Sequence, residues 1–188
     1  MTAPEWTVLG TLPAVPALER PDLLGETVAA ALKALDAADA ELIGVAEIDP
    51  GLADTAAFCA AYSSPVESSA NCVVVAGRRG DEVRYAACLV LASTRADVNG
   101  LVRRRLNARK ASFAPMDEAV ALTAMEYGGI TPIGLPEGWP LLVDAAVATA
   151  PAVVVGSGVR HSKLALPGAL VAALPGAEVV DGLGRRPS

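Results

Sequence analysis

The spacing of apolar residues along the chain switches repeatedly between the period of a helix and that of a strand. Residues 21–39 carry an apolar stripe with helical spacing, and Pro21 stands where a proline can open a helix. Residues 54–62 are rich in alanine and begin at Asp54, a residue type that often caps a helix. We therefore expect an amphipathic helix over residues 21–39 and a short helix over residues 54–62.

Two apolar runs on either side of a charged turn give the clearest strand signal. Residues 72–76 read Cys-Val-Val-Val-Ala, residues 78–81 read Arg-Arg-Gly-Asp, and residues 83–91 are again mainly apolar. Apolar runs joined by a short turn that contains glycine are typical of a β-hairpin. The sequence therefore predicts a hairpin over these segments.

The remaining segments continue the alternation of short strands and helices. Asp97 is expected to cap a helix that runs to about residue 107. Further strands are expected at residues 41–48, 110–114, 141–143, 153–155 and 163–166, and helices at 115–125 and 167–174. This order predicts a single α/β domain over residues 1–188, with helices around a mixed sheet that curls towards a barrel. The ends, residues 1–11 and 182–188, are polar or rich in proline and glycine, and we expect them to be loose.

Composition narrows the class of protein. The chain has 188 residues, of which 53% are hydrophobic and only 4% aromatic, so the core is built from alanine, valine and leucine. No apolar run approaches the ~18 residues that span a membrane. The first residues lack the basic and apolar regions of a secretory signal. We therefore expect a cytoplasmic protein that does not contact a membrane.

The acidic net charge of −6 is unevenly distributed. Residues 1–77 hold eleven acidic and two basic residues, whereas residues 78–110 hold nine basic and three acidic residues. Such a local excess of positive charge suits an RNA phosphate backbone. From charge alone, however, a solvated helix face together with a charged hairpin tip is the preferred interpretation.

Few residues are suited to metal binding or to nucleophilic catalysis. The three cysteines, Cys59, Cys72 and Cys88, lie among apolar residues without metal-ligand spacing, which predicts reduced core thiols. His161 is the chain's one histidine, so a histidine-rich metal centre or a Ser-His-Asp hydrolase is not expected. We expect neither a metal nor a cofactor.

Residues 128–136, Gly-Gly-Ile-Thr-Pro-Ile-Gly-Leu-Pro, concentrate glycine and proline more than any other stretch. Glycine lets a bare backbone amide approach a ligand, and proline fixes φ and removes a donor. The stretch therefore predicts either a complicated loop or a site whose walls are main-chain atoms.

The order of these motifs resembles the YbaK/EbsC family. This family includes the editing domain inserted in bacterial prolyl-tRNA synthetases and free-standing relatives that hydrolyse mischarged aminoacyl-tRNA. The resemblance covers roughly residues 41–181. It rests on the hairpin, Asp97 to Leu101, Lys110 to Ala114, Glu118 to Thr123, the stretch 128–135, Val143-Asp144 and Val154 to Gly158.

The resemblance implies a fold, a reaction and two site loops. It implies that Gly128, Gly129, Ile130, Thr131 and Pro132 form a Gly-x-x-x-Pro loop that presents amides to the aminoacyl group. The terminal ribose hydroxyl of the tRNA would help to position the water. The alternative for this loop is a rigid turn between a helix and a strand. A second implied loop, close to the amino-acid pocket, contains Gly156, Ser157, Gly158 and His161.

Some side chains near the second loop have more than one interpretation. His161 either shapes the amino-acid pocket or is a solvent-facing or locally capped histidine. Arg160 and Lys163 either add phosphate contacts or belong to an ordinary surface. Among the basic residues, the candidates for tRNA contact are Arg84, Arg95, Arg103, Arg104 and Arg105.

The chain departs from the family pattern at Asn71. Active members carry a lysine there, in a pattern like Lys-Thr-Leu-Val-Val, whereas this chain reads Asn-Cys-Val-Val-Val. Asparagine donates hydrogen bonds but lacks the charge and reach of lysine. Either Asn71 keeps a weaker positioning role, or another base such as Arg84 or Arg95 reaches the site, or the chemistry is lost.

The leading hypothesis is a free-standing aminoacyl-tRNA deacylase with Asn71 and the loop from Gly128 to Pro132 at its site. A second hypothesis is a protein of the same fold that binds aminoacyl-tRNA, an amino acid or a protein without hydrolysis. A third is an interaction domain whose glycine loops are structural. The expected partners are aminoacyl-tRNA and an aminoacyl-tRNA synthetase, with no role for DNA.

Overall fold

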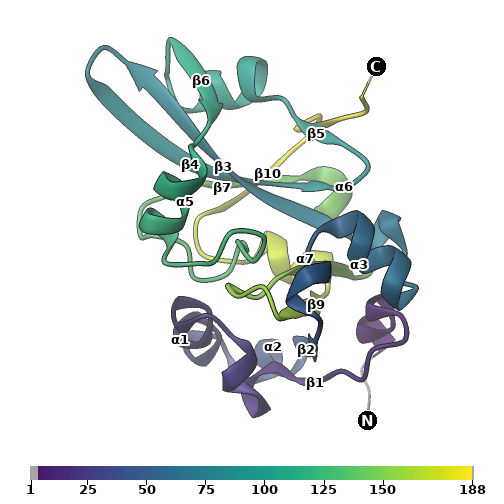
Figure 1. Cartoon of the computed structure of the whole chain (residues 1–188). Coiled ribbons are helices and arrows are strands. Elements are labelled where there is room, and N and C mark those ends of the chain that lie inside the picture. Colours follow the sequence, from purple (N-terminus) through teal and green to yellow (C-terminus); the bar gives the residue numbers. More distant parts are fainter. Residues whose placement is uncertain (1–3, 188) are drawn as a thin grey trace.

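Two β-sheets form the centre of the protein, whose computed structural model describes residues 4–187 (Figure 1). The larger sheet has five strands in the order β10-β7-β4-β3-β6, and the smaller has four in the order β1-β2-β9-β8. A two-stranded pair, β11-β5, lies apart from them. The strands are β1 Val15–Pro16, β2 Gly44–Glu47, β3 Ala70–Arg79, β4 Glu82–Leu91, β5 Arg95–Ala96, β6 Lys110–Phe113, β7 Leu141–Asp144, β8 Val153–Gly156, β9 Ser162–Leu166, β10 Ala177–Val180 and β11 Gly184–Arg185.

The predicted hairpin is confirmed as β3 and β4, the two longest strands. They pair antiparallel from Ala70 opposite Leu91 to Arg79 opposite Glu82. Gly80 in the turn has a φ of 61°, a left-handed conformation that glycine adopts readily. β6 adds antiparallel to β3, whereas β7 and β10 add in parallel beyond β4. The mixed sheet expected from the sequence is therefore present.

The predicted curl towards a barrel is wrong. Within residues 4–187, β6 pairs only with β3 and β10 only with β7, so the larger sheet remains open. A barrel requires every strand to have two neighbours and a consistent stagger. Strands as short as β6, β7 and β10, with four residues each, cover one side of the hairpin without reaching around it.

Three apolar clusters hold the sheets together. The largest lies between the two sheets and includes Leu89 of β4, Val143 of β7 and Leu164 of β9. A second covers the far face of the larger sheet, against residues 98–106. The third covers the far face of the smaller sheet and includes Trp6 and Phe58. Each sheet is therefore buried on both faces, which explains the apolar composition of the strands.

The helices are short and lie around the sheets. They are α1 Glu26–Ala34, α2 Ala37–Glu41, α3 Thr55–Tyr62, α4 Arg103–Arg105, α5 Met116–Thr123, α6 Ala145–Ala148 and α7 Gly168–Ala172, with a π-helix at Val98–Val102. Shorter 3₁₀ turns occupy Pro4–Leu9, Ala17–Glu19, Pro21–Leu23, Pro50–Leu52 and Val66–Ser68. The Asp97 cap is confirmed, because its carboxylate accepts hydrogen bonds from the amides of Gly100 and Leu101.

The single helix expected over residues 21–39 is wrong, because the chain breaks it twice. The amide of Gly25 donates to the carbonyl oxygen of Ser157 at 2.8 Å, so this residue pairs with a distant segment and α1 begins only after it. A second break at Leu35 and Asp36 separates α1 from α2. Tertiary pairing overrides the helical pattern here.

Parts of both ends that were expected to be loose are packed against the rest of the protein. Trp6 is buried, and its indole Nε1 donates to the carbonyl oxygen of Leu42 at 3.0 Å. Near the other end, Leu183 is fully buried and β11 pairs with β5. Residues 1–3 and 188 lie outside the described part. Across residues 4–187, no helix has the length and apolarity needed to cross a bilayer.

Candidate active site

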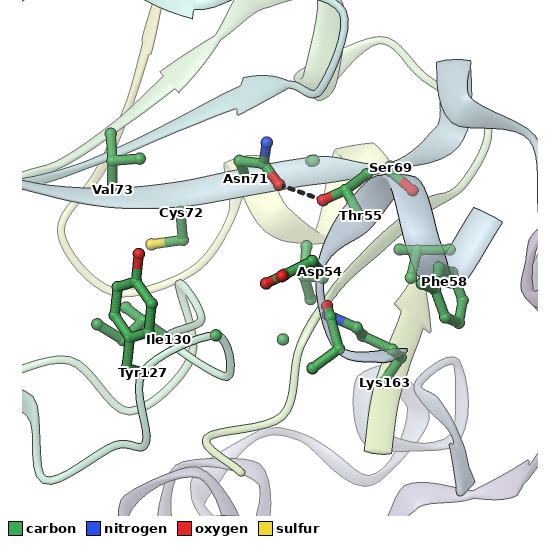
Figure 2. Close-up of a pocket in the computed structure, with 16 residues that line it drawn as sticks. Asp54, Thr55, Phe58, Ser69, Asn71, Cys72, Val73, Tyr127, Ile130 and Lys163 are labelled. Atoms are coloured by element: carbon green, nitrogen blue, oxygen red, sulfur yellow. Dashed lines mark hydrogen bonds between the residues drawn. The ribbon is translucent and has the colours of Figure 1, made fainter. Parts of the chain in front are cut away.

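A cavity of about 250 Å³ opens where the two sheets meet. The start of β3 touches β8 there through an isolated bridge between Ser69 and Val154. Helix α3 and the loop before Ile130 close the other sides (Figure 2). The lining residues are Ala53, Asp54, Thr55, Phe58, Ser69, Ala70, Asn71, Cys72, Val73, Tyr127, Gly128, Ile130, Val154, Val155, Gly156 and Lys163.

Asn71 lines the cavity from β3. Its side-chain oxygen Oδ1 accepts a hydrogen bond from the hydroxyl of Thr55 at 2.9 Å (Figure 2). This contact fixes the orientation of the amide, because the oxygen faces α3 and the two N–H donors face away from it. Asn71 can therefore offer donors to a ligand from a fixed position.

The two glycine segments predicted as site loops are joined to each other by backbone hydrogen bonds. The amide of Gly158 donates to the carbonyl oxygen of Gly129 at 2.8 Å, and the amide of Glu126 donates to the carbonyl oxygen of Gly158 at 2.9 Å. A Cβ atom on Gly156 would lie 2.4 Å from the carbonyl oxygen of Gly129. Glycine is needed there because the two main chains approach too closely for a side chain.

The backbone amides of the first loop differ in whether they already donate a hydrogen bond. The amide of Gly129 donates to the carbonyl oxygen of Glu126 at 2.9 Å and is therefore engaged. The amides of Gly128 and Ile130 donate to no acceptor within residues 4–187, and both residues line the cavity. Main-chain donors beside a cavity are suited to binding a carbonyl or anionic oxygen.

Arg160 braces this loop from outside the cavity. Its guanidinium donates to the carbonyl oxygens of Tyr127 at 2.9 Å and Pro50 at 3.1 Å. Its backbone amide donates to the Glu126 carboxylate at 2.6 Å. Arg160 therefore supports the cavity wall, and the phosphate contact expected as one alternative is not needed to explain its position.

Lys163 lines the cavity, whereas the sequence suggested only a phosphate contact or an ordinary surface for it. It lies on β9 and is only 8% exposed, so the surface interpretation of this lysine is wrong. Its Nζ donates to the carbonyl oxygen of Ala53 at 2.7 Å and lies 5.7 Å from the centre of the Phe58 ring. Burial, together with the neighbouring charge of Arg160, lowers the pKa of Lys163 to about 8. The only signal in the sequence is a lysine inside the apolar strand 163–166.

The cysteine facing the cavity is poorly suited to nucleophilic attack. Burial raises the pKa of the Cys72 thiol well above its usual range, and the nearby Cys88 adds to this effect. A protonated thiol is a weak nucleophile. All three cysteines are free, as expected. Within residues 4–187, no cluster of three histidine, cysteine or acidic side chains is arranged to hold a metal.

Several predicted site residues lie outside the cavity. Thr131 is fully buried and its hydroxyl has no partner among residues 4–187, while Pro132 lines a separate hollow of about 600 Å³. Ser157 is also fully buried and contacts the hydroxyl of Ser162 at 2.6 Å. His161 is half-buried, and its Nε2 lies 3.3 Å from the carbonyl oxygen of Asp22. Gly158 packs against Gly25 behind the cavity wall.

The basic residues separate into three groups. Arg84 and Arg105 form ion pairs with Glu82 and Glu178. Arg95 and Arg104 are exposed. Arg103 instead borders a hollow of about 550 Å³, whose other lining residues include Arg78, Arg109 and Lys110. Among residues 4–187, none of the four cations around this basic hollow has a carboxylate partner within 4.0 Å.

A family model and several solved structures match this chain. The family model described as "Aminoacyl-tRNA editing domain" matches residues 49–173, which include all the lining residues of the cavity. Searching curated proteins yielded no significant match. One similar solved structure is described as a candidate trans-editing enzyme for prolyl-tRNA synthetase, with 22% identity, a TM-score of 0.68, and coverage of 84% of this chain and 94% of that one. Another, the hypothetical protein APE2540, has 19% identity, a TM-score of 0.72, and coverage of 85% and 100%. At these identities the structural likeness concerns the fold.

Proposed function

The chain belongs to the aminoacyl-tRNA editing domain family, and on this premise we propose that it is an aminoacyl-tRNA deacylase, a hydrolase that acts on mischarged tRNA. The observation that carries the proposal is the cavity, which gathers Asn71, Gly128, Ile130 and Gly156 from distant parts of the sequence. The amides of Gly128 and Ile130 donate no hydrogen bond within residues 4–187, which supports a reaction that depends on main-chain donors. We further propose that the protein acts in the cytoplasm as a free-standing enzyme.

The proposed reaction needs little beyond these donors, because an aminoacyl ester is already activated. Water adds to the ester carbonyl carbon, and the π electrons of the C=O bond move to the oxygen. The amides of Gly128 and Ile130 stabilise that oxyanion. The C–O bond to the ribose then breaks, the ribose oxygen takes a proton, and the products are a free amino acid and a tRNA. A terminal ribose hydroxyl of the tRNA positions the attacking water.

The other cavity residues have supporting roles in the proposal. Asn71 orients the end of the tRNA with its amide donors, because Thr55 already occupies its oxygen. Gly156 limits the width of the amino-acid pocket. Ser157, Gly158 and His161 hold this wall from behind, and Thr131 and Pro132 anchor the loop.

The body of the tRNA is proposed to contact the basic hollow. Arg78 and Asn71 both lie on β3, about 23 Å apart if each strand residue rises ~3.3 Å. Phosphates beyond the aminoacylated end could therefore meet Arg78, Arg103, Arg109 and Lys110. Arg84 and Arg105 are weaker candidates because acidic neighbours already pair with them.

The decisive experiment is hydrolysis of a panel of mischarged tRNAs that includes Ala-, Cys- and Ser-tRNA. We expect release of the amino acid from at least one member at micromolar enzyme, and a loss of about tenfold or more in Asn71→Ala, since one orienting contact is removed. Thr149→Ala, a change at an exposed hydroxyl far from the cavity, is the control. Absence of hydrolysis across the whole panel would contradict the proposal.

A second candidate function is binding without hydrolysis. It is favoured by Asn71, which stands where active members of the family are expected to have a lysine. In that case the wild-type protein would bind an amide-linked aminoacyl-tRNA analogue but release no amino acid from the ester. Activity that appears only in Asn71→Lys would identify a pocket that has lost a catalytic cation. A synthetase partner is also proposed, since the similar solved structure is described as serving prolyl-tRNA synthetase.

A further inference from the structure

Two opposite charges face the same cavity without forming an ion pair. Lys163 enters from β9, and Asp54 enters from the residue that precedes α3 (Figure 2). The charge of Asp54 acts on the titration of Lys163, so the two groups are neighbours. Lys163 nevertheless has no carboxylate oxygen within 4.0 Å among residues 4–187. A direct contact between them would satisfy both charges, and its absence leaves each available to a ligand.

Lys163 is an unusual buried cation. Its Nζ has three N–H donors, and one of them binds the carbonyl oxygen of Ala53. Burying an ammonium is costly unless its charge is balanced. The structural partners of Lys163 are a neutral carbonyl and the face of the Phe58 ring. Two donors therefore remain for a group that enters the cavity.

The Asp54 carboxylate is also available to a ligand. It occupies the N-cap position of α3, where an aspartate commonly accepts a hydrogen bond from a backbone amide. Here its side chain accepts no capping hydrogen bond. The carboxylate is exposed at the cavity and is directed into it (Figure 2). Asp54 therefore presents a negative charge at the mouth, while Lys163 presents a positive charge at the buried wall.

We propose that Asp54 and Lys163 recognise the two ends of an α-aminoacyl ester, with Asp54 accepting hydrogen bonds from the free α-ammonium and Lys163 donating to the ester carbonyl oxygen. This inference rests on the proposed function and assigns its substrate class, an ester whose amino group is unmodified. The opposite orientation would place the α-ammonium beside Lys163, where like charges repel. The pair therefore sets the direction in which the aminoacyl group enters.

The carbonyl oxygen is a better partner for Lys163 than a phosphate group. The cavity of about 250 Å³ is smaller than a typical site for a drug-sized ligand. A phosphate would have to lose most of its hydration to reach a lysine that is 8% exposed. A carbonyl oxygen enters neutral and becomes negative only when water adds to the adjacent carbon. A fixed ammonium then stabilises the charge that develops in the reaction.

Hydrolysis with these groups requires no additional reactant. Water adds to the carbonyl carbon, the π electrons move to the carbonyl oxygen, and Lys163 holds that oxygen by hydrogen bonds without transferring its proton. Collapse of the intermediate breaks the bond to the ribose oxygen, which takes the proton released by the water. Asp54 keeps its hydrogen bonds to the α-ammonium throughout.

Substitution of Lys163 by methionine tests the hydrogen bond from Lys163 to the ester carbonyl oxygen. Lys163→Met keeps most of the side-chain length but removes the charge, so we expect kcat to fall about 100-fold with KM changed less than about threefold. Lys33→Met, at an exposed lysine of α1, is the matched control and should retain full activity. A phosphate anchor would instead raise KM with little change in kcat, and would overturn the assignment to the ester carbonyl.

The pH profile gives a second readout for Lys163. On an N-acetylated substrate, whose amine cannot titrate, kcat corrected for spontaneous hydrolysis should fall above about pH 8, because Lys163 then loses its proton. Arg160, Asp54 and Cys59 are the ionisable groups that act on this lysine. The falling limb should disappear in Lys163→Met. Its persistence in that variant would contradict the role of Lys163.

Asp54 is tested with a pair of substrates. Asp54→Asn should lower kcat/KM at least tenfold for an aminoacyl-tRNA with a free amino group, but less than twofold for its N-acetylated form. Asp36→Asn is the matched control, since Asp36 is also an N-cap residue whose side chain makes no capping hydrogen bond. Equal losses on both substrates would overturn the contact with the α-ammonium.

The experiments distinguish a failure of the proposed function from a failure of the roles assigned to Asp54 and Lys163. If wild type hydrolyses the panel while Lys163→Met and Asp54→Asn behave like their controls, the inference falls and the proposed function stands. If wild type hydrolyses nothing, the proposed function and the assignment of Lys163 to the oxyanion both fall. Binding of an amide-linked analogue that weakens in Asp54→Asn would then preserve only the recognition of the α-ammonium.

Discussion

At the scale of single residues, the buried charge of Lys163 lowers the free energy of unfolding at pH values below about 8. Its pKa falls from 10.5 in the unfolded chain to about 8 in the folded protein. Between these values the unfolded chain holds a proton that the folded chain has released, so the free energy of unfolding rises with pH. Below about pH 8 both states are protonated and the full cost of the buried charge is present. That cost is on the order of 3 kcal/mol.

We therefore expect Lys163→Met to unfold at higher urea concentration than wild type at pH 7. The gain should be on the order of 2 kcal/mol, because loss of the hydrogen bond to Ala53 offsets about 1 kcal/mol of the relief. The advantage should shrink as the pH rises from 8 towards 10. Urea unfolding at pH 7 and pH 10, with Lys33→Met as the control, measures both effects. A variant less stable than wild type at pH 7 would contradict the assignment.

The sequence located some site residues and missed others for a physical reason. Asn71, Gly128 and Gly156 were candidates because of the family resemblance, and they line the cavity. The burial of Lys163 was not foreseen, because it depends on Ala53 and Phe58, which are distant in the sequence. No local sequence pattern distinguishes a lysine whose side chain packs against α3 from one whose side chain faces solvent.

At the scale of elements, the site depends on the contact between the end of β8 and the loop around Gly129. Gly156 ends β8, and its backbone lies against the carbonyl oxygens of Gly129 and Ile130. The hairpin was predictable because its period and its turn are local properties. The break before α1 was not, because it arises from the pairing of Gly25 with Ser157.

Gly156→Ala tests the close contact of the loops. The new methyl group would need to displace backbone atoms 2.4 Å away, so we expect a loss of about 1–3 kcal/mol in the free energy of unfolding. Hydrolysis should fall more than stability alone explains, because the amides of Gly128 and Ile130 would shift. Gly182→Ala is the control: its Cβ would meet nothing within 4 Å, so it carries only the strain of a left-handed φ of 71°, roughly 1–2 kcal/mol, without a contact between loops. Denaturant unfolding measures the stability of both variants, and hydrolysis assays at a temperature where both are folded measure their activity. Unchanged activity in Gly156→Ala would contradict the role of the amides of Gly128 and Ile130.

At the scale of the whole molecule, a positive hollow lies on an acidic protein. The net charge of −6 would repel RNA if it were evenly spread. Arg78, Arg103, Arg109 and Lys110 instead gather at one hollow without carboxylate partners among residues 4–187. The sequence indicated the excess of charge, but only the packing of β6 against β3 showed which cations converge.

The double variant Arg103→Ala/Arg109→Ala should weaken binding of uncharged tRNA and flatten its salt dependence. We expect the slope of log affinity against log salt to fall by about 2, or about 1 for each lost phosphate contact. Arg84→Ala is the matched control, because Glu82 already pairs with that arginine. Fluorescence anisotropy with labelled tRNA at several salt concentrations gives the slopes. Equal slopes for the double variant and the control would exclude the hollow as the RNA contact.

The bridge between Ser69 and Val154 has a consequence for the evolution of substrate choice. Because the cavity spans the seam between two sheets, its width follows the spacing of those sheets. That spacing is set by close-packed residues such as Leu89 and Val155, and packed interiors respond to changes as small as one methylene group. Relatives that accept larger or smaller amino acids are therefore expected to differ in the core between the sheets, even where the residues that touch the substrate are identical.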